Sequence, residues 1–368
     1  MKLTLMVKLL PTTTQSAALL EAMERFNAAC NAVAEIAFRE HTANKIRLQG
    51  LVYYDIRRDF GLPAQMAVRA ISKVAEAYKR DKSKLPSFRA HGAIVYDQRV
   101  LSWKGLDRVS ILTLQGRQLI PVVFGGYQAA RLKNIRGQID LIYRDGKFYL
   151  AVVVDVPEPP TNEPEDWLGV DLGIVNIAAD SDGNTYTGGK VNGLRKRCAK
   201  LRARLQSKGT TSAKRLLKKR RRKETRLARD VNHVISKHLV AKAKDTGRGI
   251  ALEYLKGIRD RITVRKAQRR IQHSWAFHQL RSFIEYKAAL AGVPVVAVDP
   301  RNTSRTCPTC SHVAKANRPT QTSFLCVSCG FAGPADTIAA ENIRRVAVNQ
   351  PRAAGQMAQS QAPSVRAG

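Results

Sequence analysis

The sequence predicts a mixed α/β protein in which helices and a small β-barrel precede an α/β domain that carries a zinc-binding module. Its 368 residues are enough for two or three domains, each with a hydrophobic core. Residues from Gln15 to about Lys84 repeat apolar side chains with a helical period, whereas residues from about Ala90 to Val156 form short apolar runs between turns. The segment 157–166, rich in proline and acids, marks the clearest domain boundary.

The N-terminal half begins with a strand-like segment, residues 1–10, and continues into the helical region. After Pro63 the apolar positions recur at i, i+3, i+4 and i+7, and they are Ala67, Val68, Ile71, Val74, Ala75 and Tyr78. The opposite face of this helix carries Gln65, Arg69, Lys73 and Arg80, which fits either a solvated face or a nucleic-acid contact. The Val/Ile/Leu/Tyr runs after Ala90 predict a small antiparallel barrel or sandwich.

The charge of the chain points to a polyanionic partner. Lys and Arg number 63 against 29 Asp and Glu, so the formal net charge is +34. Nucleic acid is the first candidate and an anionic membrane surface the second. The sequence has no apolar run of 18 residues, and six cysteines in 368 residues do not form a disulfide scaffold. We therefore expect a cytoplasmic protein that binds nucleic acid, associated with the nucleoid when bound to DNA, and no membrane partner.

The basic charge is most concentrated between Arg195 and Arg229, where 17 of 35 residues are Lys or Arg and one, Glu224, is an acid. A solvated helix face normally mixes charges of both signs. We therefore expect this stretch to contact nucleic acid, and we select five candidate side chains: Arg195, Arg202, Lys218, Arg221 and Arg229.

Three acids follow or begin apolar elements in the second half of the chain. Asp171 ends the strand-like segment WLGVD, Glu253 ends GIALE, and Asp336 begins a short helix. Phosphodiester hydrolysis needs an activated water and a stabilised leaving oxygen. Two Mg²⁺ ions about 3.5–4 Å from each other provide both, and clustered carboxylates are the ligands that hold such ions. The three acids are therefore candidate magnesium ligands and catalytic residues.

The cysteines give the most specific spacing. Cys307, Cys310, Cys326 and Cys329 follow the pattern C-x₂-C-x₁₅-C-x₂-C, which predicts one structural Zn²⁺ in a tetrahedral four-thiolate site. Cys30 and Cys198 fit no pattern and are expected to be ordinary thiols. The sequence contains no H-E-x-x-H motif and no Walker loop, so a zinc protease or a nucleotide hydrolase has no support.

The second half resembles the TnpB family of insertion-sequence proteins, relatives of the type V CRISPR effectors. The matching segments are GVDLGIVNIA, ALEYL, the helix end from Tyr286 to Gly292 before VPVVAVDP, Arg301–Cys307, ADTIAAENI, and Arg229–His233. The resemblance is strong over about residues 165–345, whereas residues 1–160 match the family only in architecture. Tyr254 departs from the family pattern, in which another acid often follows the second acid.

The resemblance implies an α/β RNase H-like (RuvC) nuclease, at 161–302 and 334–347, with an inserted zinc ribbon at 303–333. It also implies a wedge-like β-barrel at 1–10 and 90–160 and a helical recognition domain at 11–89. Residues 348–368 show no periodicity, and we expect them to be a disordered tail. Asp171, Glu253 and Asp336 would hold two Mg²⁺ ions, and the four late cysteines one Zn²⁺. For the target-adjacent motif we select Tyr54, Lys73 and Arg80, from the exposed helix face and neighbouring aromatic residues.

The resemblance further implies an RNA-guided DNA endonuclease. A guide RNA from the transposon end would pair with a double-stranded DNA target beside a short adjacent motif, with one protein monomer per guide. Two other functions remain open. A DDE-type transposase shares the RNase H-like core but orders its acids Asp, Asp, Glu, and a nuclease-independent RNA-guided regulator would not need the intact acids. A compact CRISPR-associated effector would be almost identical biochemically.

Overall fold

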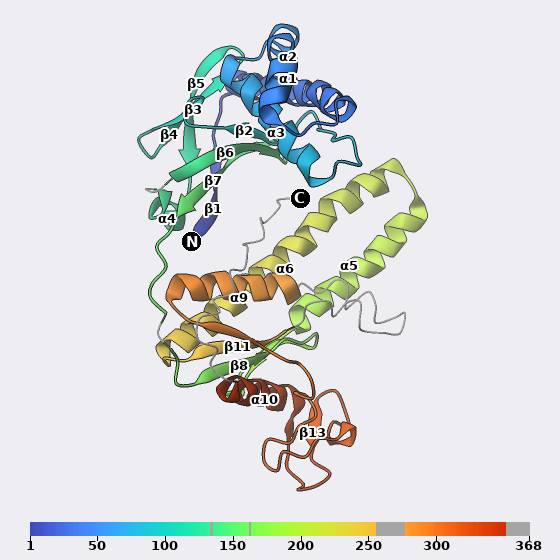
Figure 1. The fold of residues 1–368 in the computed structure, drawn as a ribbon. Helices are drawn as coiled ribbons and strands as arrows, with labels where there is room; N and C mark the ends of the chain where they lie inside the picture. Colours follow the sequence, from blue (N-terminus) through green and yellow to red (C-terminus); the bar gives the residue numbers. More distant parts are fainter. Residues whose placement is uncertain (133–134, 162, 255–276, 351–368) are drawn as a thin grey trace. The chain divides into compact units, whose positions relative to one another are not determined.

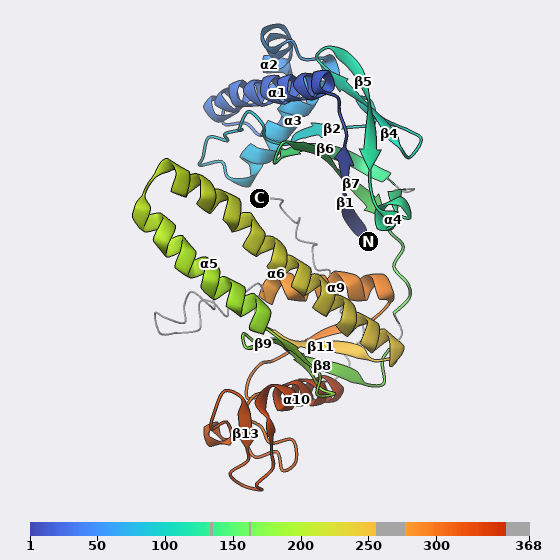
Figure 2. The same cartoon turned by 180° about the vertical axis from the view of Figure 1, so that it is seen from behind.

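The chain divides into two compact units, Met1–Pro157 and the residues from Glu158 onward. The computed structural model describes residues 1–132, 135–161, 163–254 and 277–350 (Figures 1 and 2). None of the helices in these ranges is long and apolar enough to cross a lipid bilayer.

The first unit is built on a seven-stranded antiparallel sheet in the order β2-β6-β7-β1-β5-β4-β3. Its strands are β1 (Lys2–Leu9), β2 (Ile94–Tyr96), β3 (Leu101–Lys104), β4 (Arg108–Thr113), β5 (Gly116–Val123), β6 (Ile135–Arg144) and β7 (Lys147–Asp155). The Tyr96 hydroxyl donates to the Leu112 carbonyl (3.0 Å) and the Leu112 N–H donates to the Val100 carbonyl (2.9 Å). The first bond joins the edge strand β2 to β4, and the second joins β4 to the residue before the other edge strand, β3, so the predicted antiparallel barrel is confirmed in a nearly closed form.

Three helices connect β1 to β2. They are α1 (Thr13–Arg39), α2 (Lys45–Phe60) and α3 (Ala64–Arg80), and a short α4 (Gly126–Ala129) follows β5. α1 starts at a capping box in which the Thr12 hydroxyl accepts from the Gln15 N–H, and α2 ends at Gly61 in the left-handed region (φ 63°). The helices and the barrel share one hydrophobic core, which contains the predicted apolar stripe of α3 except Val68.

The second unit contains a five-stranded mixed sheet in the order β10-β9-β8-β11-β12. Its strands are β8 (Trp167–Asp171), β9 (Asn176–Asp180), β10 (Thr185–Thr187), β11 (Gly249–Glu253) and β12 (Val295–Val298). β8, β11 and β12 run parallel, whereas β9 and β10 run antiparallel to their neighbours. The unit is therefore a mixed α/β layer structure rather than a doubly wound parallel sheet.

Helices cover both faces of this sheet (Figures 1 and 2). On one face, α6 (Thr211–Asp245) and α9 (Phe277–Ala291) pack Leu239 and Ile284 against Val170 and Leu252. On the other face, α10 (Ala335–Asn349) packs Ile343 against Ala251.

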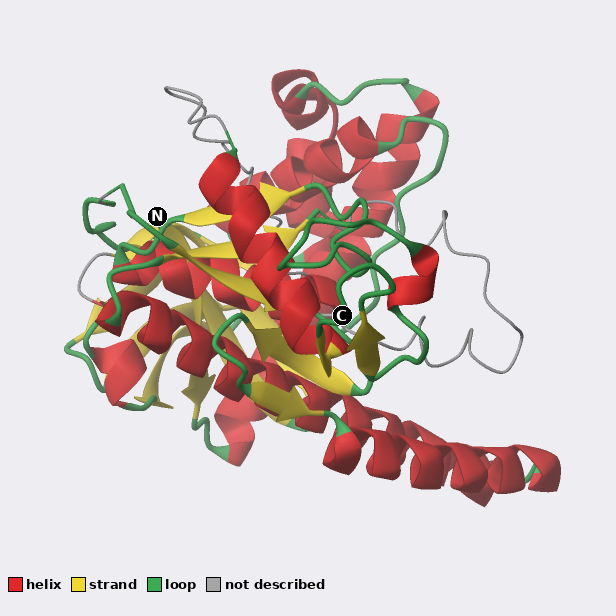
Figure 3. Cartoon of the chain, turned by 90° about the horizontal axis from the view of Figure 1, so that it is seen from below, coloured by secondary structure: helices red, strands yellow, loops and turns green. Residues whose placement is uncertain are grey.

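α5 (Gly189–Lys208) and α6 form a long helical hairpin that turns at Gly209 (φ 63°), and Figures 1 and 3 show the two helices side by side. Two ion pairs fix the sheet end of the hairpin. Lys242 contacts the fully buried Asp180 of β9 (2.7 Å), and Arg248, just after α6, contacts Asp182 (2.6 Å). The part of the hairpin far from the sheet has few buried side chains, among them Leu205 and Ala213.

The cysteine segment forms a small module between β12 and α10. It contains the two-stranded sheet of β13 (Ser323–Leu325) and β14 (Ala332–Pro334), and a short 3₁₀ turn at Lys315–Asn317. Cys307, Cys326 and Phe324 form its core together with Ala335 and Ile338 of α10. The module is therefore packed directly on the helix that carries Asp336.

Candidate metal centre and nucleic-acid surface

Asp171 and Glu253 end two neighbouring parallel strands. The register pairs Val170 of β8 with Leu252 of β11, so the next residue along each strand is one of the two acids. Because parallel strands end at the same edge of a sheet, the two carboxylates lie on that edge together. The strand residues before them are buried and apolar, which fixes the backbone that presents the acids.

Asp336 reaches the same region from the first turn of α10. This helix crosses β8 so closely that a Cβ atom at Gly169 would lie 2.0 Å from the Ala340 carbonyl oxygen. Glycine is therefore required in β8 at this position. The Arg344 guanidinium on α10 also contacts Asp166, just before β8, at 2.9 Å.

The electrostatics of the three acids are coupled. Burial, together with the negative charges of Glu253 and Asp336, raises the pKa of Asp171 to about 7. Burial also raises the pKa of Glu253. Groups with strongly perturbed pKa values are concentrated at functional sites, and repelling carboxyl groups at one sheet edge and on the adjoining α10 favour a cation there.

Neighbouring side chains hold these acids by hydrogen bonds and an ion pair. Arg318, from the cysteine module, donates to Asp336 Oδ1 (3.2 Å), and its charge lowers the pKa of both Asp171 and Glu253. Asn176 Nδ2 donates to Asp336 Oδ2 (2.9 Å), and the Thr303 hydroxyl donates to Glu253 Oε1 (2.6 Å).

Sequence reasoning did not select Arg318, Asn176 or Thr303. Asn176 and Thr303 lie inside the segments GVDLGIVNIA and Arg301–Cys307 that carry the family resemblance, so a signal was present. Arg318 lies outside every such segment, and its role depends on how the cysteine module folds.

The donor set of the three acids suits a hard divalent cation. Carboxylate oxygens are the ligands that Mg²⁺ prefers in proteins, and their mutual repulsion is offset here by the Arg318 charge. Within the described part of the chain, the four late cysteines are the one His, Cys, Asp and Glu group whose ligand atoms all lie within 4.8 Å of one another.

The cysteine cluster fits the predicted zinc site. Cys307 Sγ lies 3.6 Å from Cys329 Sγ, and Cys310 Sγ lies 3.5 Å from Cys326 Sγ. Burial raises the pKa of the Cys307 thiol, but the backbone N–H groups of Cys310 and Thr309 and the neighbouring thiols outweigh it and bring the pKa to about 6. The four Sγ atoms lie within 4.8 Å of one another, and the lowered pKa of Cys307 makes its thiolate readily available. This arrangement matches a closed four-thiolate Zn²⁺ site.

The buried Asn317 joins the two halves of the cysteine module. Its Nδ2 donates to the carbonyls of Arg305 (2.9 Å) and His312 (3.0 Å), and its Oδ1 accepts from the Val327 N–H (3.0 Å). The two Cys-x₂-Cys segments are thereby held together by one side chain as well as by the cysteines.

The candidate nucleic-acid contacts on the hairpin differ in their surroundings. Lys218 and Arg229 are exposed, Arg202 pairs with Glu224 (2.9 Å), and Arg195 is half-buried, with burial lowering its pKa. The side chain of Arg221 lies outside the described residues. These positions remain predictions, and the exposed pair is the best placed for phosphate contact.

The three candidates of the N-terminal unit also differ. Tyr54 is 79% exposed and Arg80 is exposed, whereas Lys73 is half-buried. The Lys73 ammonium donates to Asn27 Oδ1 (3.0 Å) and to the Ala93 carbonyl (2.6 Å), and burial lowers its pKa. Lys73 is thus engaged within the protein, because it holds the segment before β2 against α1.

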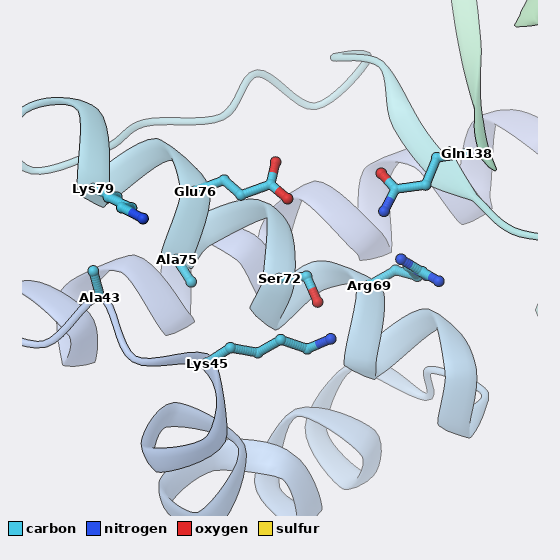
Figure 4. A pocket seen from close by; sticks show the side chains of 8 residues that line it. All are labelled: Ala43, Lys45, Arg69, Ser72, Ala75, Glu76, Lys79 and Gln138. Carbon is cyan, nitrogen blue, oxygen red and sulfur yellow. The ribbon is translucent and has the colours of Figure 1, made fainter. Parts of the chain in front are cut away.

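A cavity of about 220 Å³ lies beside α3 (Figure 4). It is lined by Ala43, Lys45, Arg69, Ser72, Ala75, Glu76, Lys79 and Gln138. Arg69 donates through Nε to Asp97 (2.8 Å), and Glu76 lies among the basic side chains. The lining is therefore of mixed charge and not a simple anion site.

Two family models match the second half of the chain. The model described as a probable transposase, of the IS605 OrfB type, matches residues 151–259. The model described as a Cas12f1-like TNB domain matches residues 277–343. The first match contains Asp171 and Glu253, and the second contains the four late cysteines and Asp336.

Curated relatives agree with these models. The chain is 26% identical to the putative RNA-guided DNA endonuclease InsQ of Escherichia coli K12, over 82% of this chain and 78% of the relative. It is 27% identical to the TnpB-like protein MJ0751 of Methanocaldococcus jannaschii, over 64% of this chain and 90% of the relative. It is 29% identical to the CRISPR-associated endodeoxyribonuclease Cas12f1 of Sulfoacidibacillus thermotolerans, over 60% of this chain and 54% of the relative.

The chain spans about half the length of the Cas12f1 relatives it matches, 54% of one and 40% of another. Among solved structures, a complex of Cas12f1 with single guide RNA and target DNA aligns over 94% of this chain and 99% of that chain, with 17% identity and a TM-score of 0.40. The matches of sequence and family model show that the chain belongs to the TnpB-like family of the IS605 OrfB type and carries a Cas12f1-like TNB domain.

Proposed function

We propose that this protein is a metal-dependent, RNA-guided DNA endonuclease whose catalytic acids are Asp171, Glu253 and Asp336. The observation that carries the proposal is the electrostatic coupling between Asp171 and Glu253, at one edge of the mixed sheet, and Asp336, at the start of α10. The pKa of Asp171 is raised by both other carboxylates, although the three residues are separated by 82 and 83 positions in the sequence (253 − 171 and 336 − 253). A protein that binds a polyanion has no use for such a cluster unless a cation joins it.

The sheet topology supports an RNase H-like nuclease of the RuvC type. Three strands in antiparallel order, β10-β9-β8, continue into the parallel strands β11 and β12, and helices cover both faces. The first acid ends the strand at the centre of this sheet, and the second ends its parallel neighbour.

The chemistry assigned to the acids follows from their charge. When bound, two Mg²⁺ ions would activate a water and stabilise the leaving 3′-oxygen of the scissile phosphodiester. Glu253 and Asp336 provide carboxylate ligands that Thr303, Asn176 and Arg318 orient. Asp171 binds as a carboxylate only after losing the proton that burial and repulsion favour, so its ionisation and metal binding are coupled.

The basic hairpin supports the proposal that RNA and DNA are the partners. A guide–target heteroduplex is recognised through its backbone, which requires distributed positive charge more than residues that read bases. α5 and α6 place 17 Lys and Arg against one acid between Arg195 and Arg229, and they begin and end at the sheet that carries the acids. The relatives described as RNA-guided or CRISPR-associated endonucleases agree with a guide RNA as the partner.

The experiment uses the protein purified with co-expressed RNA from its flanking element. The substrate is a plasmid library with a guide-matched target beside a randomised motif, incubated with Mg²⁺ or with EDTA. We expect cutting that requires the RNA and Mg²⁺ and selects one motif. Guide-dependent retention of the same DNA without cutting would instead support the nuclease-independent regulator.

A further inference from the structure

We propose that Thr303 is a positioning residue that fixes the Glu253 carboxylate for metal binding, and that the buried Asn342 holds Thr303 in place. This inference rests on the proposed nuclease function, since it concerns a ligand of that metal centre. It assigns a role to two residues that lie in the family-like segments Arg301–Cys307 and ADTIAAENI but that are neither acids nor zinc ligands.

The contact between Thr303 and Glu253 is short and shielded from water. Thr303 is 3% exposed, and its Oγ1 lies 2.6 Å from Glu253 Oε1. The same hydroxyl lies 3.1 Å from the Pro300 carbonyl, but it has a single proton, and the shorter contact is to a carboxylate. Hydrogen bonds to charged groups are stronger than bonds between neutral groups, so the proton belongs to the Glu253 contact.

The position of Thr303 is itself fixed from α10. Asn342 is 4% exposed, and its Nδ2 donates to the carbonyls of Thr303 (2.8 Å) and Thr306 (2.7 Å). One amide group therefore holds both ends of the short segment that leads into the cysteine module. The Thr306 N–H adds a bond to the Asn302 carbonyl (3.0 Å), so the segment forms a closed turn.

Glu253 needs this support because the neighbouring Asp171 carboxylate repels its negative charge, although Arg318 attracts it. Its backbone is held by β-sheet pairing and by Arg281 Nη1, which donates to its carbonyl (3.2 Å). Its side chain still has three rotatable bonds, and after burial the largest cause of the raised pKa of Asp171 is repulsion between the Asp171 and Glu253 carboxylates. A hydroxyl on Oε1 opposes that repulsion, and it leaves Oε2 for a cation.

The arrangement has the form of an outer-shell partner of a metal ligand. Such partners orient the ligand without touching the metal, and removing one commonly costs about 10–100-fold in metal affinity. Thr303 is also four residues before Cys307, so the turn that orients Glu253 leads directly into the zinc module.

The test measures Mn²⁺ binding by the full chain loaded with its RNA, using electron paramagnetic resonance to count free ions. Thr303→Val keeps the shape of the side chain and removes the hydroxyl, and Thr303→Ser keeps the hydroxyl. We expect Thr303→Val to weaken Mn²⁺ binding by about 10-fold or more and Thr303→Ser to stay within about 3-fold of wild type. Zinc content and melting temperature, measured on the same samples, should match wild type for both variants.

The outcomes separate this inference from the proposed function. If wild type binds Mn²⁺ and Asp171→Asn does not, but Thr303→Val binds as well as wild type, the positioning role is wrong and the metal centre stands. If wild type and Asp171→Asn bind Mn²⁺ equally, the metal centre itself is wrong. A Thr303→Val protein that loses zinc or melts early would make Thr303 a purely structural residue, and equal loss in Thr303→Ser would contradict the role of the hydroxyl.

Discussion

At the scale of single residues, the protein keeps a carboxyl group where its charge is unfavourable. Asp171 lies at the end of a buried strand beside two other acids, and its pKa is raised to about 7. The motifs around Asp171, Glu253 and Asp336 predict these three acids as metal ligands, and that role stays a prediction. Their hydrogen-bond partners Thr303, Asn176 and Arg318 were not predicted, because each contact joins segments that only the folded cysteine module and sheet bring together.

Asp171 should make stability depend on pH in the absence of metal. Its pKa is about 7 in the folded protein and about 4 when unfolded, so the folded state binds more protons between these values. Stability should therefore fall as pH rises from about 4 to 7, by at most about 4 kcal/mol. We expect Asp171→Asn to melt several degrees higher than wild type at pH 8 in EDTA.

The measurement is a melting curve across this pH range with and without Mg²⁺. Added Mg²⁺ should stabilise wild type at pH 8 and leave Asp171→Asn almost unchanged. Asp245→Asn, an exposed acid on α6, is the matched control and should follow wild type. A lower melting temperature for Asp171→Asn at pH 8 in EDTA would contradict the assigned burial cost.

At the scale of elements, two parts of the second unit, the α5–α6 hairpin and the cysteine module, bury few apolar side chains of their own. The α5–α6 hairpin presents a surface of cations with few buried side chains, and the cysteine module has a core of five buried residues. The charge run and the cysteine spacing predicted both elements. The ends of the two helices were less predictable. Packing and the turn at Gly209 set these ends, whereas the run of basic residues continues across the turn without a break.

Removing exposed cations from the hairpin should weaken RNA binding in a salt-dependent way. Lys218 and Arg229 are exposed on α6, and replacing both with Gln removes up to two phosphate contacts. We expect the slope of log K against log salt concentration to become shallower by roughly 1 to 2 in total. Filter binding of the guide RNA at several salt concentrations measures this slope.

The matched control is the double variant Lys237→Gln and Lys244→Gln, which removes two exposed cations near the sheet end of the same helix. Its slope should change less than that of the first pair. Equal changes in both double variants would show that binding follows net charge and not the hairpin surface.

Breaking the cysteine cluster should release zinc and destabilise α10. Cys326 is buried against Ala335 and Ile338, which lie on either side of Asp336. We expect Cys326→Ser to hold far less than one Zn²⁺ per chain and to melt about 5 °C or more below wild type. Metal analysis and calorimetry measure the two effects, and Cys198→Ser on α5 should keep both zinc and stability. Full zinc content in Cys326→Ser would contradict the four-thiolate site.

At the scale of the whole molecule, the sequence predicted the local elements and the domain boundary better than the pairing of strands that are far apart in the chain. The alternating runs after Ala90 and the boundary near Pro157 follow from composition, and the nearly closed barrel confirms the first of them. The sequence alone did not show that β1 pairs with β7 from Lys2↔Asp155 to Lys8↔Tyr149, because partners 141 to 153 positions apart (149 − 8 and 155 − 2) leave no local signal of register. Nor did it show that the three helices and the barrel share one core.

The central claim is that two acids on one sheet edge and a third at the start of α10 make this TnpB-like protein a nuclease. The most direct measurement is the single-turnover rate of cutting a guide-matched plasmid in Mg²⁺ by wild type and by Asp171→Asn, Glu253→Gln, Asp336→Asn and Asp245→Asn. We predict that the first three variants retain RNA and target DNA but cut at least about 100-fold more slowly, while Asp245→Asn cuts like wild type. Cutting by all four variants at the wild-type rate, or binding without cutting by wild type, would contradict the claim.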